Sequence, residues 1–366
     1  MRQRTVYWLC ALILGSAAGQ VRAVEPDPCI PPDTIFALKV RPRQILTSAL
    51  VKDLGWDELF KTTIAAVGPV QEFLDTAGLR IERDLESILW CMPSSPLVDD
   101  PDAQPMAINP ETGEIIQPDR PAGEKPAKLW LVVLRGKFSP KKITKALENH
   151  GKSAGAPVRK LKGEGTTLLQ MDSPLGPIFL GLEGNSKLIV SNQLDRLKGS
   201  LGGGYDKLAS PRFLDGMEGL TDKESLWCVH AVEGDLKKQF ENDQSEASMK
   251  ETMSIQLSVA LSDAFRGKIT YSTPGPRHAN SLKKLVKTSM EDFEKNLKEI
   301  LKDLHEFGAS DNNQWRRAGM TFEVGIAYLA IKHGKLEVQG NNVVIQMGAN
   351  RKSLEPLLKA FGLSEQ

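Results

Sequence analysis

Apolar positions in this chain follow two periods, one near 3.6 residues and one of two residues. Within residues 255–261 every second position is Ile, Leu or Val, and the positions between are polar or small. This alternation is typical of a strand with one buried face. Residues 45–59, 64–74 and 282–304 instead repeat apolar side chains at helical spacing. The pattern therefore predicts a mixture of strands and amphipathic helices.

The order of these elements predicts an α+β fold. A strand at 34–40 is followed by helical sequence, strands at 88–91 and 129–134, a helix and a strand at 166–171. The series β-α-β-β-α-β recurs from Leu226 onward, with an additional helix and strand. Each half is therefore predicted to form an antiparallel sheet with helices on one face, in the split-βαβ arrangement called ferredoxin-like.

The chain is long enough for two domains, which we place at residues 24–204 and 205–366. The first contains a loop at 96–126 that is rich in proline and acidic residues and lacks apolar periodicity, so we expect it to be mobile. The second contains a long amphipathic helix at about 280–307. The glycine run 202–204 closes a helix and does not open one, so it is interpreted as a cap and linker, not as a phosphate-binding loop.

Residues 1–23 have the layout of a cleavable signal peptide. A basic head precedes an apolar stretch, and the segment ends in Val21-Arg22-Ala23. The stretch is far shorter than the roughly 20 residues that a spanning helix needs. Cys10 lies inside it and not after a small-residue lipobox, so no lipid anchor is predicted. We expect an exported protein, periplasmic or secreted, with no membrane span and a mature chain that starts near Val24.

Charge argues against nucleic acid as a partner. The full chain has a formal charge of +1, and removal of the signal peptide takes away three arginines and no acid, which leaves −2. A nearly neutral protein has no long-range field that attracts nucleic acid. The short basic stretch at 159–162 has no aromatic residue within it and is interpreted as a solvated strand edge.

Three cysteines, Cys29, Cys91 and Cys228, remain after removal of the signal peptide. An odd number in an exported protein leaves at least one free thiol or an intermolecular bridge. A Cys29–Cys91 disulfide is one alternative, and buried apolar thiols are the other. No Cys-x-x-Cys motif is present, which excludes the usual zinc ribbons and redox pairs.

The sharpest candidate for catalysis is a set of three motifs in the order found in penicillin-recognising enzymes. They are Ser281-Leu282-Lys283-Lys284, Ser310-Asp311-Asn312 and Lys332-His333-Gly334. Fewer than thirty residues separate Ser281 from Ser310, too few for the helical domain that intervenes in those enzymes. The third motif also has His where Thr or Ser is needed. We interpret the three motifs as chance matches.

The five histidines form no metal-binding pattern. The sequence contains no His-Glu-x-x-His motif, and a solvated or singly bonded role is predicted for each histidine. His230 shares one face of a predicted strand with Leu226, Cys228 and Val232, and a deep pocket with converging polar groups around it would favour an enzyme. The histidines are His150, His230, His278, His305 and His333.

Several local patterns resemble those of the uncharacterised exported proteins that are abundant in planctomycete bacteria. They are the signal peptide, the run from Ala77 to Ile88, the strand-helix opening at 131–142 with Arg135-Gly136-Lys137-Phe138-Ser139-Pro140, and the hairpin at 340–344. The resemblance covers most of the mature chain and consists of turn and cap signals. It implies the fold and the exported location, and no activity, because that family has none established.

These observations favour a non-catalytic exported protein that acts as a binding or structural module of the periplasm or cell envelope. Its partner would be an unknown protein or an envelope component. The sequence assigns no catalytic, cofactor-binding or metal-ligating residue. The alternative is a hydrolase whose active site is assembled from distant residues. The first reading leads because enzymes of this size usually leave a recognisable motif.

Overall fold

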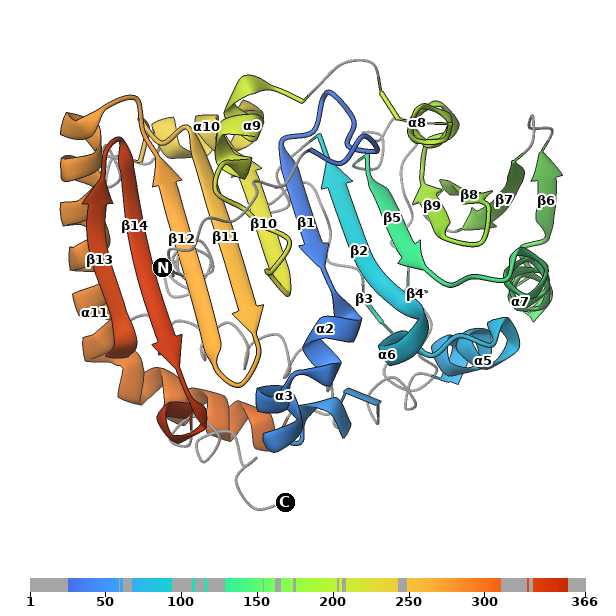
Figure 1. The fold of residues 1–366 in the computed structure, drawn as a ribbon, viewed down its shortest axis with the longest axis horizontal. Coiled ribbons are helices and arrows are strands. Elements are labelled where there is room, and N and C mark those ends of the chain that lie inside the picture. Colours follow the sequence, from blue (N-terminus) through green and yellow to red (C-terminus); the bar gives the residue numbers. More distant parts are fainter. Residues whose placement is uncertain are drawn as a thin grey trace.

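The computed structural model is built around one large sheet (Figure 1). The predicted signal peptide lies outside the described residues, and so does most of the loop at 96–126, in which the described part is the pair β3 (Ala107–Ile108) and β4 (Ile115–Ile116). The structure describes residues 26–58, 60–61, 68–93, 107–108, 115–116, 129–153, 155–161, 166–173, 176–202, 204–205, 209–242, 249–310, 328 and 332–354.

Twelve strands form a continuous antiparallel sheet in the order β13-β14-β12-β11-β10-β1-β2-β5-β9-β8-β7-β6. The α+β class with antiparallel pairing is therefore confirmed. The strands are β1 (Phe36–Val40), β2 (Leu85–Met92), β5 (Leu131–Gly136), β6 (Val158–Leu161), β7 (Thr167–Ser173), β8 (Gly176–Glu183), β9 (Lys187–Ser191), β10 (Leu226–Ala231), β11 (Ser254–Leu261), β12 (Phe265–Ser272), β13 (Gly334–Gln339) and β14 (Asn342–Ala349).

Several helices begin and end where the sequence predicts. Pro140 occupies the first turn of its helix, and Gly78, at φ 64°, follows the end of another. The predicted long helix is longer than expected. The helices are α2 (Pro42–Thr47), α3 (Ala49–Asp53), α5 (Gly68–Ala77), α6 (Ile81–Asp84), α7 (Pro140–Ser153), α8 (Leu194–Ser200), α9 (Pro211–Met217), α10 (Gly234–Asn242) and α11 (Pro276–Ser310).

The two halves of the sheet repeat one topology. In each half the first three strands lie side by side from the centre of the sheet outward, β1, β2 and β5 in one half and β10, β11 and β12 in the other. A helix follows, α7 or α11, and the last strand of the half, β9 or β14, then pairs with the third. The split-βαβ prediction is not confirmed, because β1 and β2 pair directly, whereas that arrangement places another strand between them. The predicted boundary at 204/205 falls between the halves, and β1 pairs with β10 across it.

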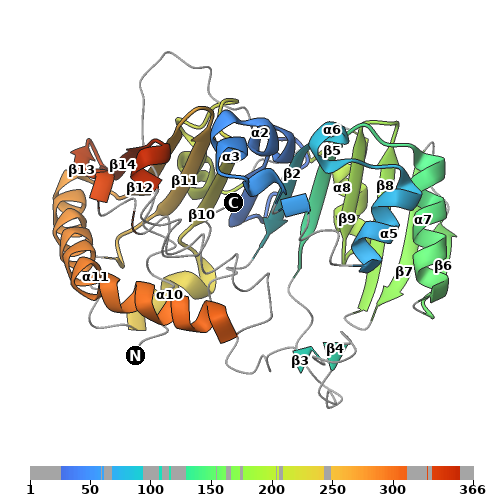
Figure 2. The ribbon, with the colours of Figure 1, turned by 90° about the horizontal axis from the view of Figure 1, so that it is seen from below.

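Helices cover both faces of the sheet, which corrects the prediction of cover on one face. Adjacent residues of β9 belong to different clusters, because successive side chains of a strand point to opposite faces. Leu188 packs in a cluster with Ile143 of α7, and Ile189 packs in a cluster with Leu197 of α8. We call the side of Leu188 the first face and the side of Ile189 the second face. Figure 2 shows α5 and α7 near one end of the curved sheet and α11 around the other.

Cross-strand registers extend these two faces over the whole sheet. The row that contains Leu188 continues through Leu134, Ile88 and Val40 to Val259 and Met347, which pack in the cluster with α10 and α11. The second face carries α8 and α9, because Phe213 and Met217 share a cluster with Trp227 and Val229. A strand that is apolar on both sides must bury both of them. One layer of helices covers only one face of the sheet, so a second layer is needed on the other.

Candidate functional site

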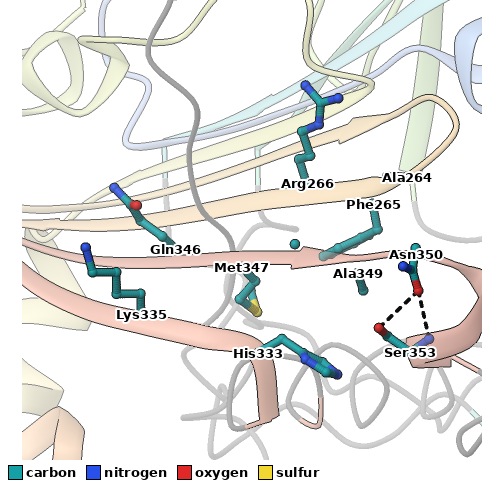
Figure 3. Close-up of a pocket in the computed structure, with 11 residues that line it drawn as sticks. Ala264, Phe265, Arg266, His333, Lys335, Gln346, Met347, Ala349, Asn350 and Ser353 are labelled. Atoms are coloured by element: carbon teal, nitrogen blue, oxygen red, sulfur yellow. Dashed lines mark hydrogen bonds between the residues drawn. The ribbon is translucent and has the colours of Figure 1, made fainter.

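A cleft of about 520 Å³ opens at one end of β12 and β14, beside the start of β13 (Figure 3). Most of its walls are backbone and side chains of these strands, and the start of the last described helical turn, 351–354, closes one end. The volume suits a small ligand or a side chain of a partner. The lining residues are Ala264, Phe265, Arg266, His333, Lys335, Gln346, Met347, Gly348, Ala349, Asn350 and Ser353.

Side chains from both faces of the sheet reach this cleft. In Figure 3, Arg266 rises from one side of the strands, while Met347 and Phe265 lie on the other. The register agrees, because Arg266 is opposite Gly348 and Phe265 is opposite Ala349. A Cβ placed on Gly348 would meet only the carbonyl oxygen of Phe265, at 3.9 Å, so the surface beside Arg266 is open. The cleft thus combines an apolar floor with a polar rim.

The polar end of the cleft is a helix cap and not a nucleophile with a base. Asn350 Oδ1 accepts hydrogen bonds from the backbone N–H of Ser353 at 3.0 Å and from its hydroxyl at 3.1 Å. This geometry is that of an N-cap residue with its third helical residue. The Ser353 hydroxyl therefore donates its hydrogen to an amide oxygen and not to the imidazole of His333, which lines the same cleft.

The ionisable side chains among the described residues that line the cleft are all basic. Arg266, His333 and Lys335 line it, and none of its described lining residues is acidic. Lys335 forms an ion pair with Glu337 on the same strand, outside the lining. Within the described residues no group of three or more His, Cys, Asp or Glu side chains is placed to hold a metal ion. The cleft can bind a neutral or anionic group, and its described lining offers no carboxylate for acid–base chemistry.

The three motifs that resemble those of penicillin-recognising enzymes do not converge in the described structure. Ser281 and Lys284 are exposed on α11. Lys332 forms an ion pair with Glu294, which follows Ser281 on the same helix by 13 residues, or about 20 Å at the helical rise. His333 lies beside Lys332 and is therefore far from Ser281. Of the middle motif, Asp311 and Asn312 lie outside the described residues.

His230 is not part of the cleft. Its side chain is 3% exposed, both ring nitrogens lack a hydrogen-bond partner, and its ring meets that of Phe36 edge to face at 5.6 Å. Burial lowers the pKa of this imidazole to about 4. His150 and His333 are exposed, and His278 is half-buried. The side chain of His305 lies outside the described residues.

A network of buried polar groups, which the sequence did not reveal, holds the segment before β1 against the second face. Asp27 Oδ1 lies 2.8 Å from Arg135 Nη2 and 3.1 Å from the backbone nitrogen of Cys29. Burial opposes ionisation of Asp27, but the charge of Arg135 and these hydrogen bonds outweigh it and lower the pKa of the carboxyl. Arg196 of α8 forms a second ion pair with Asp33. Such long-range pairs leave no local sequence signal.

The thiol of Cys29 lies inside this network and is not activated by it. Lys187 Nζ lies 3.8 Å and Arg135 Nη2 lies 3.7 Å from the sulfur, which favours a thiolate. Burial and the charge of Asp27 nevertheless raise the pKa of Cys29 to about 11. Burial also raises the pKa of Cys91 and of Cys228. All three are free thiols in the structure, so Cys29 and Cys91 are buried thiols and form no disulfide there.

Residues 159–161 of the basic stretch lie on β6, at one edge of the sheet, and Lys162 lies outside the described residues. Arg159 pairs with Asp172 at 3.0 Å, and Lys160 pairs with Glu148 at 3.2 Å. Charges that are paired in this way do not form a phosphate-binding patch. None of the described helices is long and apolar enough to cross a membrane.

The chain was compared with known protein families, curated proteins and solved structures. No known protein family and no curated protein matches the chain. A solved structure described as crystal form I of TP0453 is similar over 94% of this chain and 99% of its own, with 8% sequence identity and a TM-score of 0.39. Similarity at this level carries no argument about activity. Fold and cleft together define an α+β protein built on a large antiparallel sheet.

Proposed function

We propose that this chain is an exported, non-catalytic binding or structural protein of the periplasm or cell envelope. The observation that carries the proposal is the contact of Lys332 with Glu294, which lies 13 residues, or about 20 Å of helical rise, beyond Ser281 on α11. Acyl transfer needs a nucleophile and its base within hydrogen-bond reach. A binding role needs only a stable surface with a concave region, and the cleft between β12, β14 and β13 provides one.

Two further features support a binding role over a hydrolase. The hydroxyl of Ser353, which lines the cleft, is held by Asn350 and not by a base. His230 is buried, and it is not among the described residues that line the cleft. The partner is proposed to be a protein or an envelope component, and the relation to exported proteins of planctomycete bacteria remains part of this proposal.

Export predicts a specific mature N-terminus. The signal-peptide layout ends in Val21-Arg22-Ala23, so the mature chain is expected to start near Val24. Cleavage at this point would keep Cys29 and Ile30, which are buried in the fold, in the mature chain. N-terminal sequencing of the protein from the extracytoplasmic fraction measures the start directly. Retention of Met1, or a protein that stays with the membrane after a salt wash, would contradict export without an anchor.

A further inference from the structure

The two halves of the sheet meet at the β1–β10 pair, and the two ends of this seam differ. At one end Val40 is opposite Leu226, and beyond it Arg41 pairs with Asp222 while Gln44 Nε2 donates to the carbonyl of Lys223 at 2.8 Å. At the other end Phe36 is opposite His230. The first end is therefore held by ionic and polar contacts, and the second is held by backbone pairing and an aromatic contact.

His230 is poorly suited to become charged in this position. It lies on the first face, where its cross-strand neighbours are Phe36 on β1 and Ile255 on β11. Neither ring nitrogen has a hydrogen-bond partner. An imidazolium has two N–H donors and a positive charge, and both would be buried without compensation.

Among the described residues no charged group offsets this cost, because burial alone lowers the pKa of His230. Cys228 on β10 and Tyr271 on β12 share the face with His230, and burial raises the pKa of both, so they stay neutral at acidic pH. Glu86 lies on β2 beyond Ile88, at the Val40 end of the seam. The remaining side chains that the described parts of β1, β2, β10, β11 and β12 place on this face in the paired rows are not titratable.

We propose that His230 makes the Phe36–His230 end of the β1–β10 seam an acid-sensitive switch, in which protonation of the imidazole opens this end while the Arg41–Asp222 end stays closed. Opening exposes the ring to water and solvates the charge. The proposal concerns a conformational device and is independent of the proposed function.

The direction of the effect follows from linkage. The pKa of His230 is about 4 in the closed seam, below the ordinary value of 6.5 that the solvated ring regains on opening. The open state therefore binds the proton more tightly, and opening becomes more favourable as pH falls below 6.5, an effect that levels off below about 4. Between pH 7.5 and pH 5 the opening equilibrium constant is expected to rise about 30-fold.

Hydrogen exchange of the full chain, followed by mass spectrometry and corrected for the intrinsic pH dependence of exchange, tests this proposal. In overlapping peptides, the amides at the Phe36–His230 end of β1 and β10 are expected to show the rise of about 30-fold. The amides at the Val40–Leu226 end and in the β13–β14 hairpin are expected to show none. His230→Phe keeps an aromatic contact with Phe36 and should abolish the rise. His150→Gln, which removes an exposed histidine, should retain it.

Two results would overturn the proposal. The first is acid-dependent opening that persists in His230→Phe or that affects the β13–β14 hairpin equally. The second comes from NMR titration of the His230 ring in the wild-type protein, which decides the matter if His230→Phe does not fold at pH 7.5, as judged by circular dichroism. A ring that titrates near 6.5 while β1 and β10 remain protected contradicts the switch, and one that titrates only as the seam opens supports it.

Discussion

Replacing Leu282 with Asp is expected to unfold the half of the sheet from β10 to β14. Leu282 lies on α11, is 0% exposed, and packs in the cluster with Val286 and Ile345 on the first face. A carboxylate there has no partner and loses its hydration, which costs about 3–5 kcal/mol, a large part of the roughly 5–15 kcal/mol that stabilises a domain. Urea unfolding followed by circular dichroism measures the loss.

Thr288→Asp is the matched control on the same helix. Thr288 is exposed, so the new carboxylate stays hydrated and the midpoint of urea unfolding should change little. If Leu282→Asp were as stable as Thr288→Asp, the packing of α11 against the first face would be wrong. The stripe predicted from the sequence also includes Leu297 and Leu301, whose side chains lie outside the described residues.

Replacing Phe213 with Ala is expected to destabilise the protein by about 3–5 kcal/mol, the usual cost of removing a buried aromatic side chain. Phe213 is 0% exposed on α9 and packs with Val229 and Trp227 on the second face. Thermal melting together with urea unfolding gives the loss.

Asp215→Ala removes an exposed side chain from the same helix and should leave the melting temperature almost unchanged. A small effect of Phe213→Ala would mean that α9 does not seal the second face. The two buried substitutions together test whether both faces of the sheet need helical cover.

Local elements of the fold were predictable because their signals are local. The Gly340-Asn341 turn joins β13 to β14 as predicted, since a tight hairpin needs residues that tolerate positive φ, and Gly340 has φ 60°. Pro140 marks the start of α7 for a similarly local reason. Such signals act within a few residues and do not depend on which strands pair.

Strand pairing was not predictable, because the alternation of apolar residues is the same for many topologies. Phe36 and His230 lie far apart in the chain, and nothing in either segment specifies the other as its partner. Helical cover on both faces does have a local signal in the sequence. Leu131 and Val133 are buried on the second face while the residues between them face the other way, so a strand that is apolar on both sides requires helices on both.

The cleft was partly predictable. Asn350 followed by Ser353 before an apolar position is a helix-start pattern, and the structure forms this cap. Arg266 gave no signal, because it reaches the cleft only through the pairing of β12 with β14. The network around Asp27 and Cys29 was not predictable either, since its partners come from β5, β9 and α8.

Covalent labelling tests most directly the central claim that this protein works without a catalytic serine. Wild-type protein and Ser281→Ala are incubated with a β-lactam probe, and their intact masses are compared. Because Ser281 is exposed on α11 and distant from Lys332 and His333, we expect no adduct on either protein and equal melting temperatures. A stoichiometric adduct on the wild type that is lost in Ser281→Ala would contradict the account.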